Sequence, residues 1–214
     1  MDFQSIRKEY EDRGIDADAL NDCPIEQLRL WLDEANKNSP GRWFESNAMA
    51  LATCGKDSKV SVRFVLLKGI TPEGVQFFTN YDSAKGKQLA ENPNCSASLH
   101  WPFQGRQVRI SGTAEKTSRE QSLQYFHTRP RGAQLGAAIS AQSAEISDRK
   151  ELQQKMDRLQ AELGEAPVPL PENWGGYLIR LNEVEFWQGR SSRLHDRIVY
   201  RGGDGKWKKS LLSP

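Results

Sequence analysis

The sequence has few cysteines and no long hydrophobic run. Its three cysteines, Cys23, Cys54 and Cys95, are spread widely over 214 residues. An odd and widely spaced set suits neither a disulfide framework nor a metal site, so we expect free thiols in a reducing compartment and no bound metal. No stretch approaches the ~20 apolar residues of a membrane span, and the N-terminus lacks the apolar core of a signal peptide. These absences predict a soluble, cytoplasmic protein.

An excess of one charge and the common catalytic motifs are also missing. The 30 basic and 28 acidic residues give a net charge of +2, which implies neither a nucleic acid nor an acidic membrane as partner. The chain has no glycine-rich dinucleotide or nucleotide-phosphate loop, no zinc-binding pair of histidines spaced along a helix and no serine-hydrolase elbow. Metal-dependent hydrolysis and dinucleotide binding through a Rossmann turn are therefore disfavoured.

Alternating apolar residues predict strands joined by short turns in the middle and at the end of the chain. The predicted strands are 48–54, 59–67, 75–79, 95–101, 107–115, 177–181, 184–187, 197–201 and 206–211. Their connections are too short for repeated helical crossovers. We therefore expect a mainly antiparallel sheet of the α+β class, barrel-like and decorated by helices.

Helices are predicted between these strands and before them. They cover 24–38, 83–92, 118–129 and 131–139, followed by a longer helix that Ser147 or Asp148 caps and that runs to Leu163. Ser118 and Gln121 fit a capping box at the third of these helices. Residues 1–22 are expected to form a short helix or a mobile arm, and residues 23–214 a single domain.

Two basic residues bracket the apolar run from Val62 to Lys68 in a predicted strand. Burying an unpaired cation is costly, so Arg63 and Lys68 each need water or an anion. Taken alone, the segment favours Arg63 paired with a carboxylate in the core and Lys68 reaching solvent at the strand end. A period of two residues puts the two side chains on opposite faces and predicts different partners for them.

Two further clusters combine cations with aromatic groups. Tyr125 and Arg129 are four residues apart on one face of a predicted helix end. They suit a phosphate, although cations at a helix C-terminus also interact favourably with the helix dipole. The run 185–197 includes Trp187, Arg193 and His195, and it suits either a planar anionic ligand or an ordinary solvated hairpin.

Together these segments resemble the pyridoxamine/pyridoxine 5'-phosphate oxidase family over essentially the whole chain. The most specific stretches are 63–68, 124–131, 169–176 and 185–197, in family-like order and spacing. The resemblance implies an FMN-binding split β-barrel surrounded by helices. It also implies a homodimer with FMN at the subunit interface, and a C-terminal dimerisation and substrate segment at about 172–214.

The activity implied by this resemblance is the final step in the synthesis and salvage of the vitamin B6 cofactor. Pyridoxine 5'-phosphate or pyridoxamine 5'-phosphate would lose hydride from C4' to the flavin and become pyridoxal 5'-phosphate. Oxygen would accept the electrons and yield H2O2, and the amine would also release NH3. The protein would contribute orientation and electrostatics, because the flavin carries the redox chemistry.

The resemblance also assigns residues to the site by their position. Those expected to bind FMN are Arg63, Phe64, Val65, Leu66, Leu67, Lys68, Phe78, Thr79, Lys85, Gln107, Gln142, Ser143, Trp187 and Arg197. Those expected to bind the substrate are Arg7, Lys8, Glu9, Tyr10, Lys68, Tyr125, Arg129, Arg193, Leu194 and His195. Arg193 and His195 are expected to act in catalysis by orienting C4', and residues 7–10 form an N-terminal lid over the substrate.

Two positions depart from the family pattern and keep other functions open. Ala84 stands where the family often has Arg, and Ala133 where it often has Ser, so one contact to each phosphate is missing. A lost hydrogen bond to a charged group costs about 1.5–3 kcal/mol. The alternatives are a flavin reductase or nicotinamide-linked oxidoreductase on the same barrel, and a non-catalytic carrier of pyridoxal phosphate or flavin.

Overall fold

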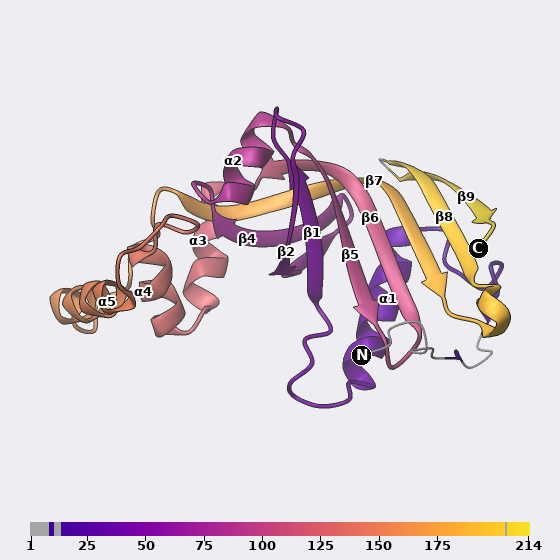
Figure 1. Cartoon of the computed structure of the whole chain (residues 1–214), viewed down its shortest axis with the longest axis horizontal. Coiled ribbons are helices and arrows are strands. Elements are labelled where there is room, and N and C mark those ends of the chain that lie inside the picture. Colours follow the sequence, from indigo (N-terminus) through magenta and orange to yellow (C-terminus); the bar gives the residue numbers. More distant parts are fainter. Residues whose placement is uncertain (1–8, 11–13, 204) are drawn as a thin grey trace.

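The chain folds around one antiparallel sheet whose strands and helices are labelled in Figure 1. The computed structural model describes residues 9–10, 14–203 and 205–214. The strands are β1 (Ala48–Cys54), β2 (Val60–Leu66), β3 (Gly69–Thr71), β4 (Gly74–Asn80), β5 (Asn94–Trp101), β6 (Arg106–Lys116), β7 (Trp174–Gln188), β8 (Asp196–Gly203) and β9 (Lys206–Leu212). The helices are α1 (Pro24–Lys37), α2 (Ala84–Glu91), α3 (Arg119–Thr128), α4 (Arg131–Ile139), α5 (Arg149–Leu163) and a short 3-10 helix, η1 (Ser191–Arg193).

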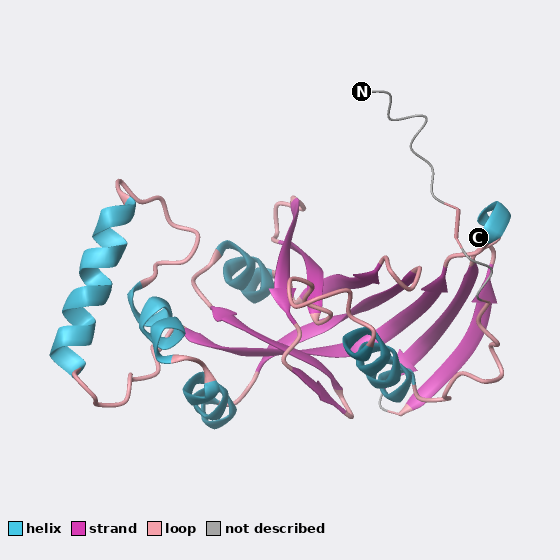
Figure 2. Cartoon of the chain, turned by 90° about the horizontal axis from the view of Figure 1, so that it is seen from below, coloured by secondary structure: helices cyan, strands magenta, loops and turns pink. Residues whose placement is uncertain are grey.

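The order of the strands is β2–β1–β5–β6–β7–β4–β3, and β8 and β9 extend the sheet beside β7. All pairings are antiparallel, which confirms the predicted class. Figure 2 shows the sheet curled, with helices lying along it and the long α5 standing at the left end. The three-residue strand β3 was not predicted, because three residues are too few to show an alternation.

The 15-residue strand β7 joins the two halves of the sheet. Its first half pairs with β4 and its second half with β8, while β6 runs along its other edge. The register with β6 shifts at Gly112 and skips Asn182, which makes a bulge. A Cβ on Gly112 would lie 2.0 Å from the Arg180 carbonyl oxygen, so only glycine fits there. The prediction of two strands, 177–181 and 184–187, is therefore wrong.

Helix α1 covers the main core with one apolar face, as its periodicity predicts. Its buried residues are Pro24, Ile25, Gln27, Leu28, Trp31 and Ala35. Trp31 meets Phe186 of β7 edge to face, with ring centroids 5.0 Å apart, and the Arg106 guanidinium lies 4.4 Å above its ring. The helix is thereby fixed to the second half of β7.

A second, smaller core lies where β7 begins, between α3, α4 and α5. Its buried members are Phe126, Leu135, Val168 and Trp174. The predicted capping box of Ser118 and Gln121 is present, and Asp148 caps α5. Arg119 donates to the carbonyls of Leu170 and Pro171 before β7 and to that of Trp174 at its start, which ties this segment to α3. None of the helices in the described part of the chain is long and apolar enough to span a membrane.

Residues 14–22 of the predicted arm run along β8 and β9. The Tyr200 hydroxyl donates to the Asn21 carbonyl at 2.8 Å, and the Lys209 amine donates to the Ala17 carbonyl at 2.9 Å. No residue of this described part of the arm is helical, and most of residues 1–13, where a helix was expected as one of two possibilities, lies outside the described residues. Arg7 and Lys8 lie outside the described residues.

We expect Trp31→Ala to lower the free energy of unfolding by about 3–5 kcal/mol, because it opens a cavity under α1 that the core cannot refill. Urea unfolding at fixed protein concentration measures the change. The matched control is Trp43→Ala: Trp43 is 76% exposed, and its removal should change stability by less than about 0.5 kcal/mol. Equal losses in the two variants would contradict this account of the core.

Candidate functional site

A cavity of about 650 Å³ opens between the end of β2, the strand β4 and the helices α2 to α4. Its volume lies in the range of sites for small molecules and cofactors. The residues predicted to bind FMN that line it are Phe64, Val65, Leu66, Lys68, Phe78, Thr79, Lys85 and Gln142. Lys68, Tyr125 and Arg129, predicted to bind the substrate phosphate, line it as well. The fold thus brings together segments that are far apart in the sequence.

Lys85 is a buried cation in the first turn of α2 and faces this cavity. Its amine donates to Thr79 Oγ1 at 3.2 Å, Gln142 Oε1 at 3.3 Å and Ser83 Oγ at 3.5 Å, all of them neutral oxygens. Burial lowers the pKa of Lys85, and repulsion from Arg63 lowers it further. A buried cation at a helix N-terminus with only neutral partners favours an anionic ligand.

Arg63 is also held by neutral oxygens, and no described carboxylate pairs with it. Its guanidinium donates to Thr53 Oγ1 at 2.6 Å, to Ser61 Oγ at 2.7 Å and to the Leu51 carbonyl at 3.1 Å. Burial lowers the pKa of Arg63. The expectation of a core carboxylate beside Arg63 is wrong, whereas the prediction of different surroundings for Arg63 and Lys68 is confirmed, because only Lys68 lines the cavity.

Aromatic rings form one wall of the cavity and carry the Tyr125–Arg129 pair. Tyr125 stacks on Phe78 with ring centroids 3.9 Å apart, and it lies parallel to Trp174. The Arg129 guanidinium lies 4.8 Å from the Trp174 ring centroid, and its buried Nη1 donates to no described residue. Burial raises the pKa of Tyr125, which keeps the phenol protonated as a donor, and burial lowers the pKa of Arg129.

A second cluster contains Tyr10, Trp187 and His195. Leu194 is exposed, and so is Glu9, which precedes Tyr10 in the chain. The Tyr10 ring meets the Trp187 and His195 rings edge to face, with centroids 5.5 and 5.6 Å away. A Cβ on Gly189 would come within 2.4 Å of Tyr10, so glycine is needed for this close contact.

The two residues predicted to act in catalysis belong to the turn between β7 and β8. Arg193 ends η1 and has a positive φ of 60°. His195 Nδ1 accepts a hydrogen bond of 3.1 Å from the Arg190 backbone N–H. This assigns the proton of the neutral imidazole to Nε2, which makes His195 a donor at its outer nitrogen.

Gln107, Trp187 and Arg197 form a row across β6, β7 and β8. Trp187 is the register partner of both Gln107 and Arg197. The Arg197 guanidinium donates from Nε to Glu185 Oε1 at 2.8 Å and from Nη2 to Glu185 Oε2 at 3.1 Å. These hydrogen bonds raise the pKa of Arg197. These three residues, predicted to bind FMN, are brought together away from the cavity.

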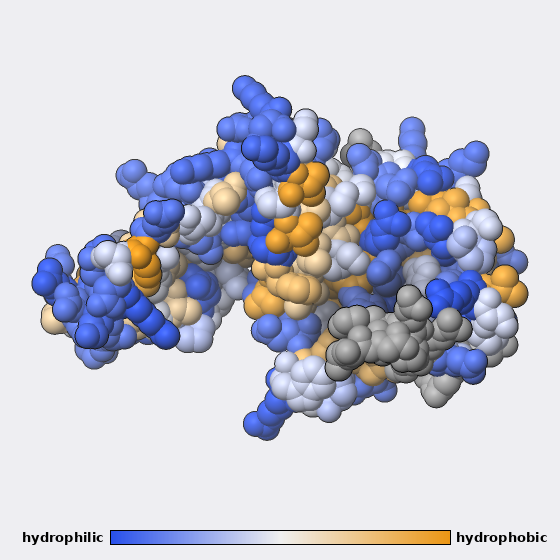
Figure 3. All heavy atoms as spheres, in the orientation of Figure 1, coloured by the Kyte–Doolittle hydropathy of each residue, from blue (hydrophilic) through white to orange (hydrophobic). Residues whose placement is uncertain are grey.

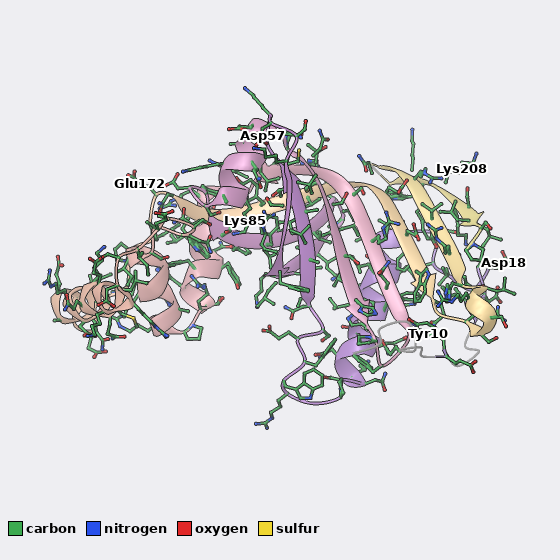
Figure 4. All side chains as sticks on the ribbon, in the orientation of Figure 1. Tyr10, Asp18, Asp57, Lys85, Glu172 and Lys208 are labelled. Atoms are coloured by element: carbon green, nitrogen blue, oxygen red, sulfur yellow. The ribbon has the colours of Figure 1, made fainter. Side chains whose placement is uncertain are left out.

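The cavity and the second cluster lie well apart in the molecule. Figure 4 labels Lys85 towards the α3–α5 end and Tyr10 near the β8–β9 end. Three other residues predicted to bind FMN are also outside the cavity lining: Arg63, Leu67, which is buried in the main core, and Ser143, which follows Gln142 in an exposed loop with φ of 71°. One copy of the chain therefore presents two separate halves of the predicted site.

Sequence reasoning missed two residues of these clusters. Trp174 lies next to Tyr125 and Arg129, and the signal for it was its place in the stretch 169–176, to which no role was assigned. Glu185 is buried between cations, and a lone glutamate in an alternating strand does not reveal that arrangement.

Comparison with known proteins agrees with the resemblance noted in the sequence. Residues 42–162 match the family described as pyridoxamine 5'-phosphate oxidase. Residues 174–214 match the family described as the pyridoxine 5'-phosphate oxidase C-terminal dimerisation region. The two matches together cover both halves of the sheet.

Curated relatives match along the full length of the chain. A pyridoxine/pyridoxamine 5'-phosphate oxidase of Salinibacter ruber is 47% identical over 98% of this chain and 97% of the relative. An enzyme of the same name from Rhodopirellula baltica is 46% identical over 99% of this chain and 96% of its own length.

Solved structures share the fold. PhzG from Burkholderia lata, crystallised in complex with tetrahydrophenazine-1-carboxylic acid, has a TM-score of 0.88 and 31% identity, covering 96% of this chain and 100% of that one. An FMN-binding protein from Nostoc punctiforme has a TM-score of 0.68 at 17% identity, which shows the fold alone. The predicted split β-barrel is confirmed, and the chain belongs to the pyridoxamine/pyridoxine 5'-phosphate oxidase family.

Proposed function

We propose that the chain is a cytoplasmic, FMN-dependent oxidase that converts pyridoxine 5'-phosphate or pyridoxamine 5'-phosphate to pyridoxal 5'-phosphate. The observation that carries the proposal is the pair of cations in one aromatic-walled cavity, Lys85 and Arg129, neither of which is paired with a described carboxylate. Two cations at separate points of a cavity suit two phosphate groups, one on the cofactor and one on the substrate. Full-length relatives with this activity support the assignment.

FMN fits the residues present in the cavity. Bound there, it would supply the acceptor for the hydride of the substrate and pass the two electrons to O2. Lys85 and the N-terminus of α2 would hold its phosphate, with Thr79 and Gln142 orienting the amine. Arg63 adds a second positive charge nearby without blocking the cavity.

The substrate phosphate would bind Lys68, Tyr125 and Arg129. Tyr125 is held by its stack on Phe78, and Arg129 by its contact with Trp174, so both donors are positioned before the substrate arrives. Ala133 lines the same cavity and offers no hydroxyl, and Ala84 opens α2 without a cation. We therefore expect weaker phosphate binding at both points rather than a lost site.

A second copy of the chain would complete each site. Strand β2 exposes Val60, Val62 and Phe64, and Figure 3 shows apolar atoms gathered over β1 and β2. Such a stripe beside the cavity suits an interface, and the C-terminal match to a dimerisation region supports one. In the proposed homodimer, the cavity of one protomer meets Arg193, His195 and Arg197 of its partner.

In this arrangement Arg193 and His195 orient the substrate rather than remove its proton. His195 Nδ1 already accepts the Arg190 N–H, so its outer nitrogen offers a proton to the polar substituent on C4'. The alcohol loses hydride from C4' and its hydroxyl proton, and O2 takes up two electrons and two protons as H2O2. The amine yields the imine, which water hydrolyses to the aldehyde and NH3.

A second candidate is oxidation of a larger aromatic carboxylate, as the ligand crystallised with PhzG suggests. The specific observation in its favour is the high structural similarity to that protein, with a TM-score of 0.88. The higher identity to the vitamin B6 enzymes, 46–47%, favours the first proposal. A non-catalytic carrier is distinguished from both by the absence of turnover.

The decisive assay measures oxygen uptake by the FMN-loaded protein with pyridoxine 5'-phosphate, and pyridoxal 5'-phosphate formation in parallel. We expect one product for each O2 consumed. A yellow, FMN-binding protein that oxidises neither the alcohol nor the amine would overturn the proposal in favour of another flavin enzyme. A protein that binds pyridoxal 5'-phosphate but not FMN would favour the carrier.

We expect Lys85→Met to weaken FMN binding by about ten- to a hundredfold, the equivalent of losing a charged hydrogen bond. Riboflavin, which lacks the phosphate, should bind the variant and the parent protein equally well. Quenching of flavin fluorescence measures both affinities. The matched control is Lys87→Met on the exposed side of the same helix, which should bind FMN normally. An equal loss for riboflavin and FMN would mean that Lys85 does not hold the phosphate.

A further inference from the structure

Glu185 is the one buried carboxylate in the described part of the chain, and Lys85 is the one other charged residue buried there. The Glu185 side chain is 5% exposed, although it belongs to the sheet strand β7 and lies between Arg109 and Arg197. A buried carboxylate is costly to desolvate and is retained only where its partners compensate for that cost. The residues that contact the Glu185 carboxylate therefore indicate its role.

Both carboxylate oxygens of Glu185 are used to hold arginines. Oε1 accepts from Arg197 Nε at 2.8 Å, and Oε2 accepts from Arg197 Nη2 at 3.1 Å. Oε2 also accepts from Arg109 Nη1 at 3.3 Å. The fork between Glu185 and Arg197 fixes the plane of the guanidinium, as bidentate pairs do.

The third guanidinium nitrogen of Arg197 contacts the backbone near the C-terminus. Nη1 donates to the Ser213 carbonyl at 3.0 Å. A guanidinium has five N–H groups, and these contacts use three of them. One N–H on each terminal nitrogen is left for a ligand, and the two arginines around one carboxylate leave a local charge of about +1.

The ion pair is not needed to join β7 to β8. Their backbone register runs without a break from Glu183 and Arg201 to Gln188 and Asp196. A pair of apolar residues would hold the same strands at less desolvation cost. Arg197 also lies in register with Trp187, so Glu185 holds the guanidinium on the strand next to a second predicted flavin residue.

We propose that Glu185 is a positioning residue that fixes the Arg197 guanidinium for contact with FMN. The inference rests on the proposed function, because that function brings Arg197 to the cofactor. Glu185 itself touches no cofactor, and its effect passes through Arg197. The prediction is therefore a loss of FMN affinity that depends on Arg197 being present.

The test measures FMN affinity of the full-length, FMN-stripped protein by quenching of flavin fluorescence. Glu185→Gln keeps the shape but removes the charge, and we expect about tenfold weaker binding, the size of one lost charged hydrogen bond. Glu185→Asp, which keeps the charge, should recover part of the affinity. The matched control is Glu183→Gln, because Glu183 lies two residues earlier on β7 and pairs with exposed Arg201 at 2.7 Å. It should bind FMN as the parent protein does.

A double-mutant cycle separates positioning from a general structural role. Arg197→Lys cannot form the fork, so adding Glu185→Gln to it should cause no further loss of affinity. The same tenfold loss in both backgrounds, or unchanged FMN affinity in Glu185→Gln, would overturn the proposal. Oxidase activity of the parent protein is measured separately, so a flavin-binding protein without turnover would end the proposed function and leave this test standing. A parent protein that does not bind FMN would overturn both.

Discussion

The arrangement of the molecule depends on one strand, β7, which has a different neighbour in each half. The bulge at Asn182 lets the strand pass from β4 to β8 without losing its partner β6. The same strand carries Trp174 at its start, in the cavity wall, and Trp187 near its end, in the second cluster. Because a strand rises about 3.3 Å per residue, these two regions are held well apart within one chain. The site as proposed therefore requires two chains.

Both halves of the proposed site contain a buried charged residue and keep an excess of positive charge. Lys85 is surrounded by neutral oxygens, and Glu185 is outnumbered by two arginines, so each region keeps an excess of positive charge. Buried charge of this kind is unfavourable in the free protein and becomes favourable when an anion enters. A phosphorylated flavin and a phosphorylated substrate would each relieve it. In the proposed function, this polar network would serve binding more than the stability of the fold.

The aromatic wall explains how a split barrel can serve different ligands. Phe78, Tyr125 and Trp174 stack on one another, and such rings would suit any planar ligand, whereas the cations beside them would select the charged group. The structural similarity to PhzG reflects the shared barrel, and the chemistry is decided by the side chains around the cavity. In the proposed site, Ala84 and Ala133 would weaken phosphate binding without removing the other contacts.

The sequence by itself determined the antiparallel class, nearly all element positions, the capping box at Ser118 and the family. Short-range patterning and local hydrogen bonding specify the class, the element positions and the cap, so these can be predicted from neighbouring residues, whereas the family came from the resemblance of four sequence stretches. The continuity of β7 could not be predicted, because an alternation interrupted by a bulge resembles two strands. The neutral surroundings of Arg63 could not be predicted either, because the position of a cation in the sequence does not identify the group that it contacts. Only the tertiary structure decided that Glu185 faces Arg197 and that Lys85 lies far from Tyr10. Glu185 and Arg197 are 12 positions apart in the sequence, and Tyr10 and Lys85 are 75 positions apart. The distance in space within each pair is set only when the chain folds.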